Sequence, residues 1–116
     1  MADVTLYHNP RCSKSRQTLS LLKENGIEPE VVEYLKTPPD VDTLSRILDM
    51  LGLEPRQLMR TKEAEYREQG MDDPSLNHDQ LIALMIKYPR VIERPILIHG
   101  NRAAIGRPPE QILEIL

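Results

Sequence analysis

The chain has 116 residues, of which 40% are hydrophobic and 28% charged, and its formal net charge is −3 at pH 7. A chain of this length and composition can bury one core, so we expect a single domain over residues 1–116. The mild acidity and the lack of Phe and Trp argue against binding to nucleic acid. No apolar run approaches the ~20 residues that span a bilayer, so we expect neither nucleic acid nor a membrane as a partner.

The first third of the chain predicts a strand, a helix and a second strand. Residues 4–7 predict a short buried strand, and residues 13–25 carry an apolar helical face that ends at Gly26. Residues 30–34 predict the second strand. Because a helix connects the two strands, we expect them to pair in parallel.

The middle of the chain predicts a helical insertion at about residues 40–90. Asp40 is a favourable N-cap for a helix that runs to about Leu51, where a glycine follows. Asn77 begins another helix with a variant of the capping-box pattern, and Pro89 stops it. Two short helices are expected between them, at residues 54–58 and 63–69.

The last third predicts a hairpin of strands at residues 96–98 and 103–105. A C-terminal helix follows, with apolar positions at Ile112, Leu113, Ile115 and Leu116. The order is therefore β-α-β, several helices, then β-β-α. This order predicts a thioredoxin-like α/β fold, with a mixed sheet of about four strands and the helical insertion between its halves. The proline before the third strand would face the end of the first strand, and we predict a cis Arg94–Pro95 bond.

Cys12 is the only cysteine, and it lies between the first predicted strand and the first predicted helix. A helix start presents unpaired N–H groups and a partial positive charge, which stabilise a thiolate. Three basic residues lie nearby, so a small anion is the expected ligand: Arg11, Lys14 and Arg16. A single cysteine cannot form an internal disulfide, and the expected location is the reducing cytoplasm.

Five segments, in this order, resemble the glutaredoxin-dependent arsenate reductase family, a thioredoxin-fold group that includes the Spx-type regulators. They cover nearly the whole chain. They are a cysteine loop at residues 7–16 (YHNPRCSKSR), a linker at 34–39 (YLKTPP), and arginine motifs at 58–60 (LMR), 92–96 (IERPI) and 105–108 (IGRP).

The resemblance implies a reaction and a set of roles. Cys12 would attack the arsenic of arsenate, glutathione would attack the resulting adduct as a co-substrate, and glutaredoxin would remove the mixed disulfide. We also expect a monomer without a tightly bound cofactor. The implied site consists of Cys12 with His8 and Ser15 in support, and of three arginines that bind the oxyanion: Arg60, Arg94 and Arg107.

The same resemblance leaves two other functions open. One is an Spx-like regulator that binds RNA polymerase without catalysis, although Ser15 occupies the place where redox-sensing Spx proteins carry a second cysteine. The other is a thiol oxidoreductase of this fold with a different substrate, because Ser13 and Lys14 differ from the Gly and Thr of the resistance reductases.

Each candidate also has an ordinary structural interpretation. The arginines could be surface residues, His8 could be a solvent-exposed loop residue rather than a cation beside the thiolate, and Ser15 could be a helix-face residue. His78 and His99 have no partner pattern, and no spaced Cys/His set supports zinc. One acidic run is most simply a solvated surface: Glu63, Glu65, Glu68, Asp72 and Asp73.

Overall fold

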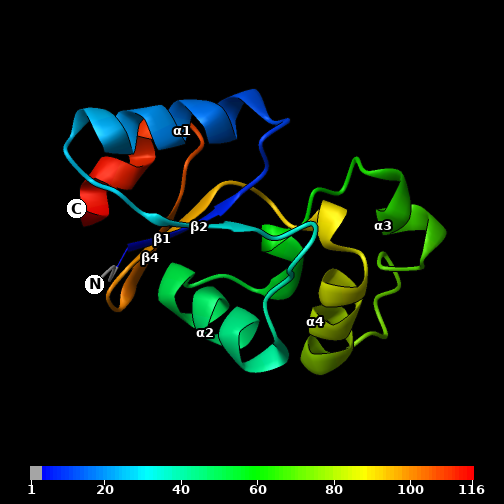
Figure 1. Cartoon of the computed structure of the whole chain (residues 1–116). Helices are drawn as coiled ribbons and strands as arrows, with labels where there is room; N and C mark the ends of the chain where they lie inside the picture. Colours follow the sequence, from blue (N-terminus) through cyan, green and yellow to red (C-terminus); the bar gives the residue numbers. More distant parts are fainter. Residues whose placement is uncertain (1–3) are drawn as a thin grey trace. The chain divides into compact units, whose positions relative to one another are not determined.

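The computed structural model describes residues 4–116 and organises them in two compact units. The first unit combines the two ends of the chain, up to Thr37 and from Arg94 to Leu116, and the second is the segment Pro38–Glu93. Figure 1 shows the first unit in blue, cyan, orange and red, and the second mainly in green and yellow. The second unit contains the residues at which the helical insertion was expected, about 40–90. The assignment of residues 1–116 to a single domain stays a prediction.

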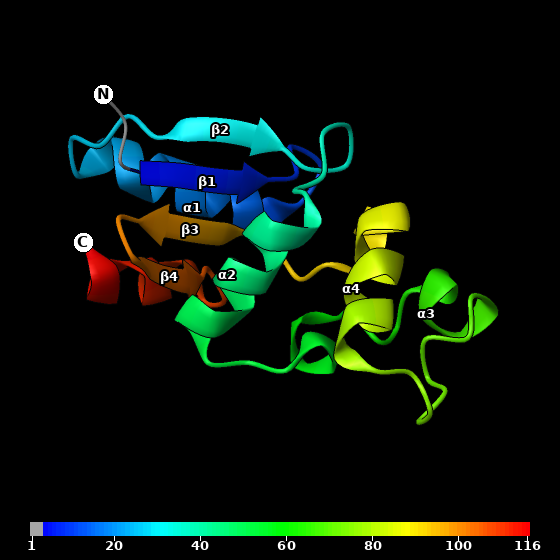
Figure 2. The ribbon, with the colours of Figure 1, turned by 90° about the horizontal axis from the view of Figure 1, so that it is seen from below.

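A four-stranded mixed sheet forms the centre of the first unit, as predicted. The strand order is β2-β1-β3-β4, with β1 parallel to β2 and antiparallel to β3, and with β3 antiparallel to β4 (Figure 2). The helical connection between β1 and β2 explains their parallel pairing. The strands are β1 (Val4–His8), β2 (Glu30–Glu33), β3 (Ile96–His99) and β4 (Arg102–Ile105).

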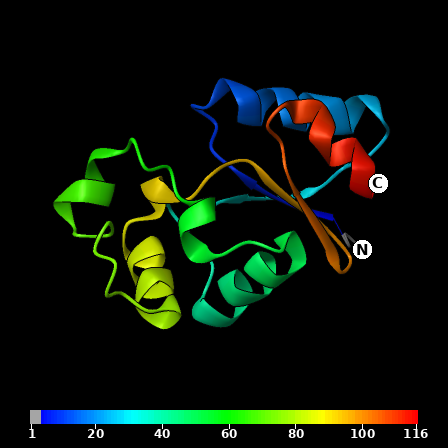
Figure 3. The same ribbon diagram turned by 180° about the vertical axis from the view of Figure 1, so that it is seen from behind.

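Helix α1 (Ser13–Glu24) and the 3-10 helix η3 (Pro109–Ile115) lie side by side on one face of this sheet (Figure 3). The apolar cluster beneath them is built from aliphatic side chains, in keeping with a sequence that lacks Phe and Trp. The predicted C-terminal helix is therefore present, and it is a 3-10 helix. The buried members of the cluster are Val4, Leu6, Leu22, Leu97, Ala104, Ile112 and Ile115.

The second unit is helical, and its caps follow the sequence. The Asp40 carboxylate accepts from the Thr43 amide at 2.8 Å, and Asn77 and Gln80 form a reciprocal capping box. Gly52 ends the first helix in a left-handed conformation, with φ +69°. The elements are α2 (Val41–Leu51), η1 (Pro55–Leu58), α3 (Ala64–Glu68), α4 (His78–Lys87) and η2 (Pro89–Val91).

Within the described residues 4–116, two peptide bonds before proline are cis. The Arg94–Pro95 bond is cis as predicted, and the Arg107–Pro108 bond, which the sequence did not single out, is cis as well. Across residues 4–116, no helix has both the length and the apolar character needed to cross a membrane.

Candidate active site

Cys12 lies in the turn between β1 and α1 and is the N-cap residue of the helix. Its backbone is extended, with φ −94° and ψ 123°. Its amide donates to the Asn9 carbonyl at 3.0 Å, and its own carbonyl accepts from the Arg16 amide at 3.0 Å. These bonds close the loop onto the first turn of α1 and leave the free thiol half-buried, so a small molecule can reach it.

Competing effects lower the pKa of the Cys12 thiol. Burial raises the pKa, but the Ser15 amide, the Arg94 side chain and the Lys14 amide lower it and together outweigh the burial. The thiol makes no formal cap hydrogen bond, so the two amides act as the oriented N–H dipoles of a helix start. The result favours the thiolate, which is the nucleophilic form.

The β3–β4 hairpin brings two of the candidate arginines to the sulfur. Ile96 pairs with Ile105, so Arg94 and Arg107 lie two residues beyond this pair at the open end of the hairpin. Arg107 donates from Nε to the Arg94 carbonyl at 2.8 Å and from Nη2 to Cys12 Sγ at 3.4 Å. The structure thus brings Cys12, Arg94 and Arg107 together.

Gly106 allows this end of the hairpin to lie close to α1. It is buried, and its amide donates to the Pro95 carbonyl at 3.0 Å. A Cβ atom at this position would overlap Thr18 Oγ1 and lie 2.8 Å from Pro95 Cγ. Only glycine therefore fits beside Arg107 without a shift of the neighbouring segments. Its place directly before the predicted arginine was the signal that could have identified it from the sequence.

His8 is a buried residue at the end of β1, and its ring contacts Ser15. His8 Nδ1 and Ser15 Oγ are 2.6 Å apart, and the Asn9 amide donates to the same oxygen at 3.1 Å. Burial lowers the pKa of His8, Glu33 opposes this by raising it, and Arg16 lowers it further. The interpretation of His8 as a solvent-exposed loop residue is wrong, because it is 6% exposed.

The lowered pKa of His8 also argues against a cationic histidine beside the thiolate. The neutral imidazole is the favoured form near neutral pH. Ser15, which is fully buried, links the ring to the backbone at Asn9. We conclude that His8 and Ser15 form a neutral hydrogen-bonded pair that holds the cysteine loop on α1.

Arg60 belongs to the second unit, where two carboxylates hold its guanidinium. Nη1 donates to Glu93 Oε1 at 2.9 Å, and Nε donates to Glu63 Oε1 at 3.3 Å. Arg90 lies 3.7 Å from the other Glu63 oxygen and 3.7 Å from a Glu65 oxygen. Glu63 and Glu65 are therefore ion-pair partners rather than a simple solvated surface. The grouping of Arg60 with Cys12 stays a prediction.

Within the described residues, the remaining histidine and acidic side chains suggest no metal site. His99 Nδ1 lies 2.6 Å from the Ile115 carbonyl oxygen, which ties β3 to the end of η3. Within the part of the chain that the structure describes, no group of three or more His, Cys, Asp or Glu residues could hold a metal ion.

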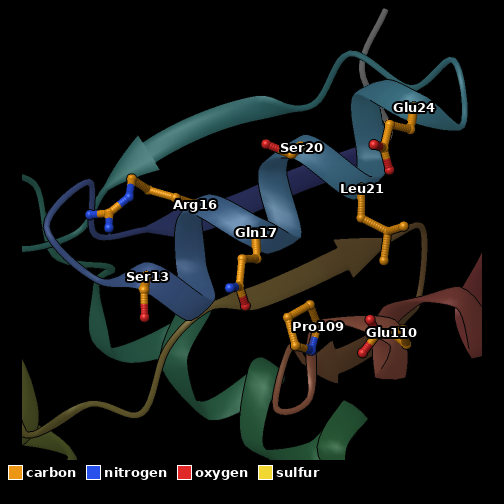
Figure 4. Close-up of a pocket in the computed structure, with 8 residues that line it drawn as sticks. All are labelled: Ser13, Arg16, Gln17, Ser20, Leu21, Glu24, Pro109 and Glu110. Carbon is orange, nitrogen blue, oxygen red and sulfur yellow. The ribbon is translucent and has the colours of Figure 1, made fainter.

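A surface groove of about 580 Å³ runs along α1 from the residue after Cys12. Figure 4 shows Ser13 and Arg16 at one end and the carboxylates of Glu24 and Glu110 at the other. This groove was not predicted from the sequence. The polar stripe of α1 was visible at helical spacing, but its opposite wall comes from η3, about 90 residues later, at Pro109 and Glu110. The full lining is Ser13, Arg16, Gln17, Ser20, Leu21, Glu24, Pro109 and Glu110.

Comparison with known proteins places this site in a family. The model of the ArsC family matches residues 7–115. The chain is 56% identical over 114 residues to the uncharacterized protein YfgD of Escherichia coli (strain K12), covering 97% of this chain and 96% of that protein. It is 48% identical to an arsenate reductase of Neisseria meningitidis over 117 residues, covering both chains completely.

A solved structure agrees with these matches. The arsenate reductase from Vibrio cholerae superimposes with a TM-score of 0.95 at 52% identity, covering 97% of each chain. This similarity confirms the predicted thioredoxin-like fold class. The residues expected to carry the chemistry all lie in the matched range.

Proposed function

The chain belongs to the ArsC family, and from this premise and the site geometry we propose that it is an arsenate reductase with Cys12 as its nucleophile. The observation that carries the proposal is the placement of a guanidinium 3.4 Å from the sulfur. That contact puts a cation where an anionic sulfur and an anionic substrate must meet.

Arsenate is a tetrahedral dianion at neutral pH, and planar guanidinium groups match its paired oxygens. Arg94 lowers the pKa of Cys12 and Arg107 contacts its sulfur, so both can hold the oxyanion beside the nucleophile. From the family resemblance we assign Arg60 the same oxyanion-binding role.

The first chemical step joins sulfur to arsenic. The Cys12 thiolate attacks the As(V) centre, and one arsenate oxygen leaves as water after taking up protons. The product is a thiol–arsenate adduct in which arsenic is still pentavalent. The arginines stabilise the negative charge on the remaining oxygens.

The second step transfers two electrons to arsenic. A glutathione thiolate attacks the Cys12 sulfur, an S–S bond forms, and the S–As bond breaks with its electron pair on arsenic. Arsenite is released, and Cys12 is left in a mixed disulfide with glutathione. A second thiol is needed because Cys12 is the chain's only cysteine.

The third step regenerates the enzyme. A glutaredoxin thiolate attacks the glutathione sulfur of the mixed disulfide, and Cys12 leaves as the stabilised thiolate. A low thiol pKa makes Cys12 both a good nucleophile in the first step and a good leaving group here. Glutathione and glutaredoxin belong to a reducing compartment, so we place the protein in the cytoplasm.

The test is arsenite formation from arsenate by the purified protein with glutathione and glutaredoxin. We expect turnover by the wild type and none by Cys12→Ser, which keeps the N-cap geometry but lacks the thiolate. Ser75→Ala, at an exposed position outside the cysteine loop and outside the groove along α1, serves as the control and should retain turnover. A wild type that forms no arsenite with an active glutaredoxin would overturn the proposal.

A further inference from the structure

We propose that the groove between α1 and η3 is the binding site of glutathione, and that its acidic end recognises the ammonium group of the γ-glutamyl residue. The inference deepens the proposed function, on which it rests for the identity of the thiol. It assigns a place to the second substrate, whereas the arginines account only for the oxyanion.

The position of the groove fits a thiol that must reach Cys12. Its lining begins at Ser13, the residue directly after the nucleophile. Arg16 Nη1 donates to the Pro10 carbonyl at 3.0 Å, and this bond holds a positive charge at the Cys12 end. The volume of about 580 Å³ lies within the range of small-molecule sites, roughly 300–1,000 Å³.

The length of the groove matches a tripeptide. Arg16 and Glu24 are eight residues apart on α1, which corresponds to about 12 Å along the helix. Three extended residues span about 10–11 Å. An extended glutathione molecule therefore has about the length of the α1 segment between these two charged residues.

Glutathione carries one ammonium and two carboxylates, and the groove offers partners for the ammonium and for the glycine carboxylate. The second carboxylate, on the same carbon as the ammonium, faces the solvent. Arg16, at the Cys12 end, can bind the glycine carboxylate, and Glu24 or Glu110, which lie on opposite sides of Leu21 at the far end, can bind the ammonium (Figure 4). Between these ends Gln17 points toward Pro109, and its amide can bond to a peptide group. A simple alkyl thiol would make none of these contacts.

Thiol–disulfide exchange tests the site without arsenic. The Cys12 thiolate attacks one sulfur of oxidised glutathione, the S–S bond breaks, and one glutathione thiolate leaves as the mixed disulfide forms. Mass spectrometry measures the rate at which the mixed disulfide forms at Cys12. Two further disulfides serve as probes: that of N-acetyl-glutathione, which lacks the ammonium, and bis(2-hydroxyethyl) disulfide, which lacks both charged arms.

We expect the wild type to react up to about fivefold faster with oxidised glutathione than with its N-acetyl form, since an exposed ion pair contributes up to about 1 kcal/mol. In the double variant E24Q/E110Q the two rates should become equal. The control is E28Q/E30Q, which changes the net charge equally at exposed positions outside the groove. It should keep the preference.

Two results would overturn the site. One is a preference that survives in E24Q/E110Q. The other is an equal slowing of all three disulfides, which would indicate a change in thiolate reactivity instead of binding. Because no arsenate is present, a protein that fails to reduce arsenate can still pass this test, and an active reductase can still fail it.

Discussion

The Arg107 guanidinium contacts the Cys12 sulfur at 3.4 Å while its Nε donates to the Arg94 carbonyl at 2.8 Å. The second bond is to a neutral backbone group, so it orients the guanidinium without cancelling its charge. Arg107 and Cys12 are 95 positions apart in sequence, and the β3–β4 hairpin places Arg107 beside Arg94. A backbone contact therefore helps to orient a cation toward the Cys12 sulfur.

Replacing either arginine at the sulfur should raise the pKa of Cys12. We expect Arg107→Gln and Arg94→Gln each to shift the alkylation of Cys12 by iodoacetamide to higher pH, because each removes a cation that favours the thiolate. The KM for arsenate should rise about tenfold or more, since a hydrogen bond to a charged group contributes about 1.5–3 kcal/mol.

The matched control for these variants is Arg11→Gln, which removes an exposed cation from the same loop. Its alkylation profile should stay close to that of the wild type, because exposed charges are screened by water and salt. Equal profiles for all four proteins would mean that the contact with Arg107 does not control the thiolate.

The lowered pKa of His8 predicts a stability loss in mild acid. In the unfolded chain His8 takes up a proton near pH ~6.5, whereas in the folded protein His8 takes up a proton only at lower pH. Between these values the unfolded state binds more protons, so the free energy of unfolding falls as the pH drops through the window. Above this pH window, the contribution of neutral His8 to the free energy of unfolding is fully present.

Urea denaturation of the wild type and His8→Gln between pH 5 and 7.5 checks this. The advantage of the wild type should be largest at pH 7.5 and shrink toward pH 5. His78→Gln, which replaces an exposed histidine of α4, is the control. If the difference in the free energy of unfolding between the wild type and His8→Gln were constant across this pH range, the burial of a neutral His8 would be ruled out.

Gly106→Ala should weaken both folding and catalysis. The added methyl group would overlap Thr18 Oγ1 and crowd Pro95, and overpacking of this kind costs about 1–3 kcal/mol. Because Arg107 is the next residue, its contact with Cys12 should be displaced. Denaturation and the pH profile of Cys12 alkylation measure the two effects separately.

The double variant Gly106→Ala/Thr18→Ala tests the cause. Removing the Thr18 hydroxyl and methyl opens space for the new Cβ, so the double variant should be less destabilised than the sum of the single variants. Strict additivity would indicate that the crowding arises elsewhere.

The sequence predicted the strands, the parallel β1–β2 pair and most helix caps, because these depend on local patterns. Asp40 and Asn77 cap the helices that they were expected to cap. The C-terminal segment was harder to predict, since its apolar spacing does not distinguish an α-helix from the 3-10 helix that forms at Pro109–Ile115.

Parts of the site depend on long-range contacts that no local pattern encodes. The loop sequence identified Cys12, but the groove wall at Glu110 and the tight fit of Gly106 arise only when α1 meets the end of the hairpin. The protonation of His8 depends on its burial, which the loop motif does not specify.

The ion pairs of Arg60 lead to a prediction about anion affinity. Glu93 and Glu63 both hold the guanidinium, with nitrogen–oxygen distances of 2.9 and 3.3 Å, and an arsenate that binds Arg60 must compete with them. Glu93→Gln keeps the side-chain shape but removes one negative charge. We therefore expect it to lower the KM for arsenate severalfold, with little change in kcat.

The effect of Glu93→Gln should depend on Arg60. In an Arg60→Gln background, which already lacks the cation, Glu93→Gln should leave the KM for arsenate almost unchanged, because there is no guanidinium left to release. Steady-state kinetics of the wild type, both single variants and the double variant give the coupling between the two residues. A KM that falls equally in both backgrounds would mean that Glu93 acts through general charge, and that Arg60 does not bind the substrate.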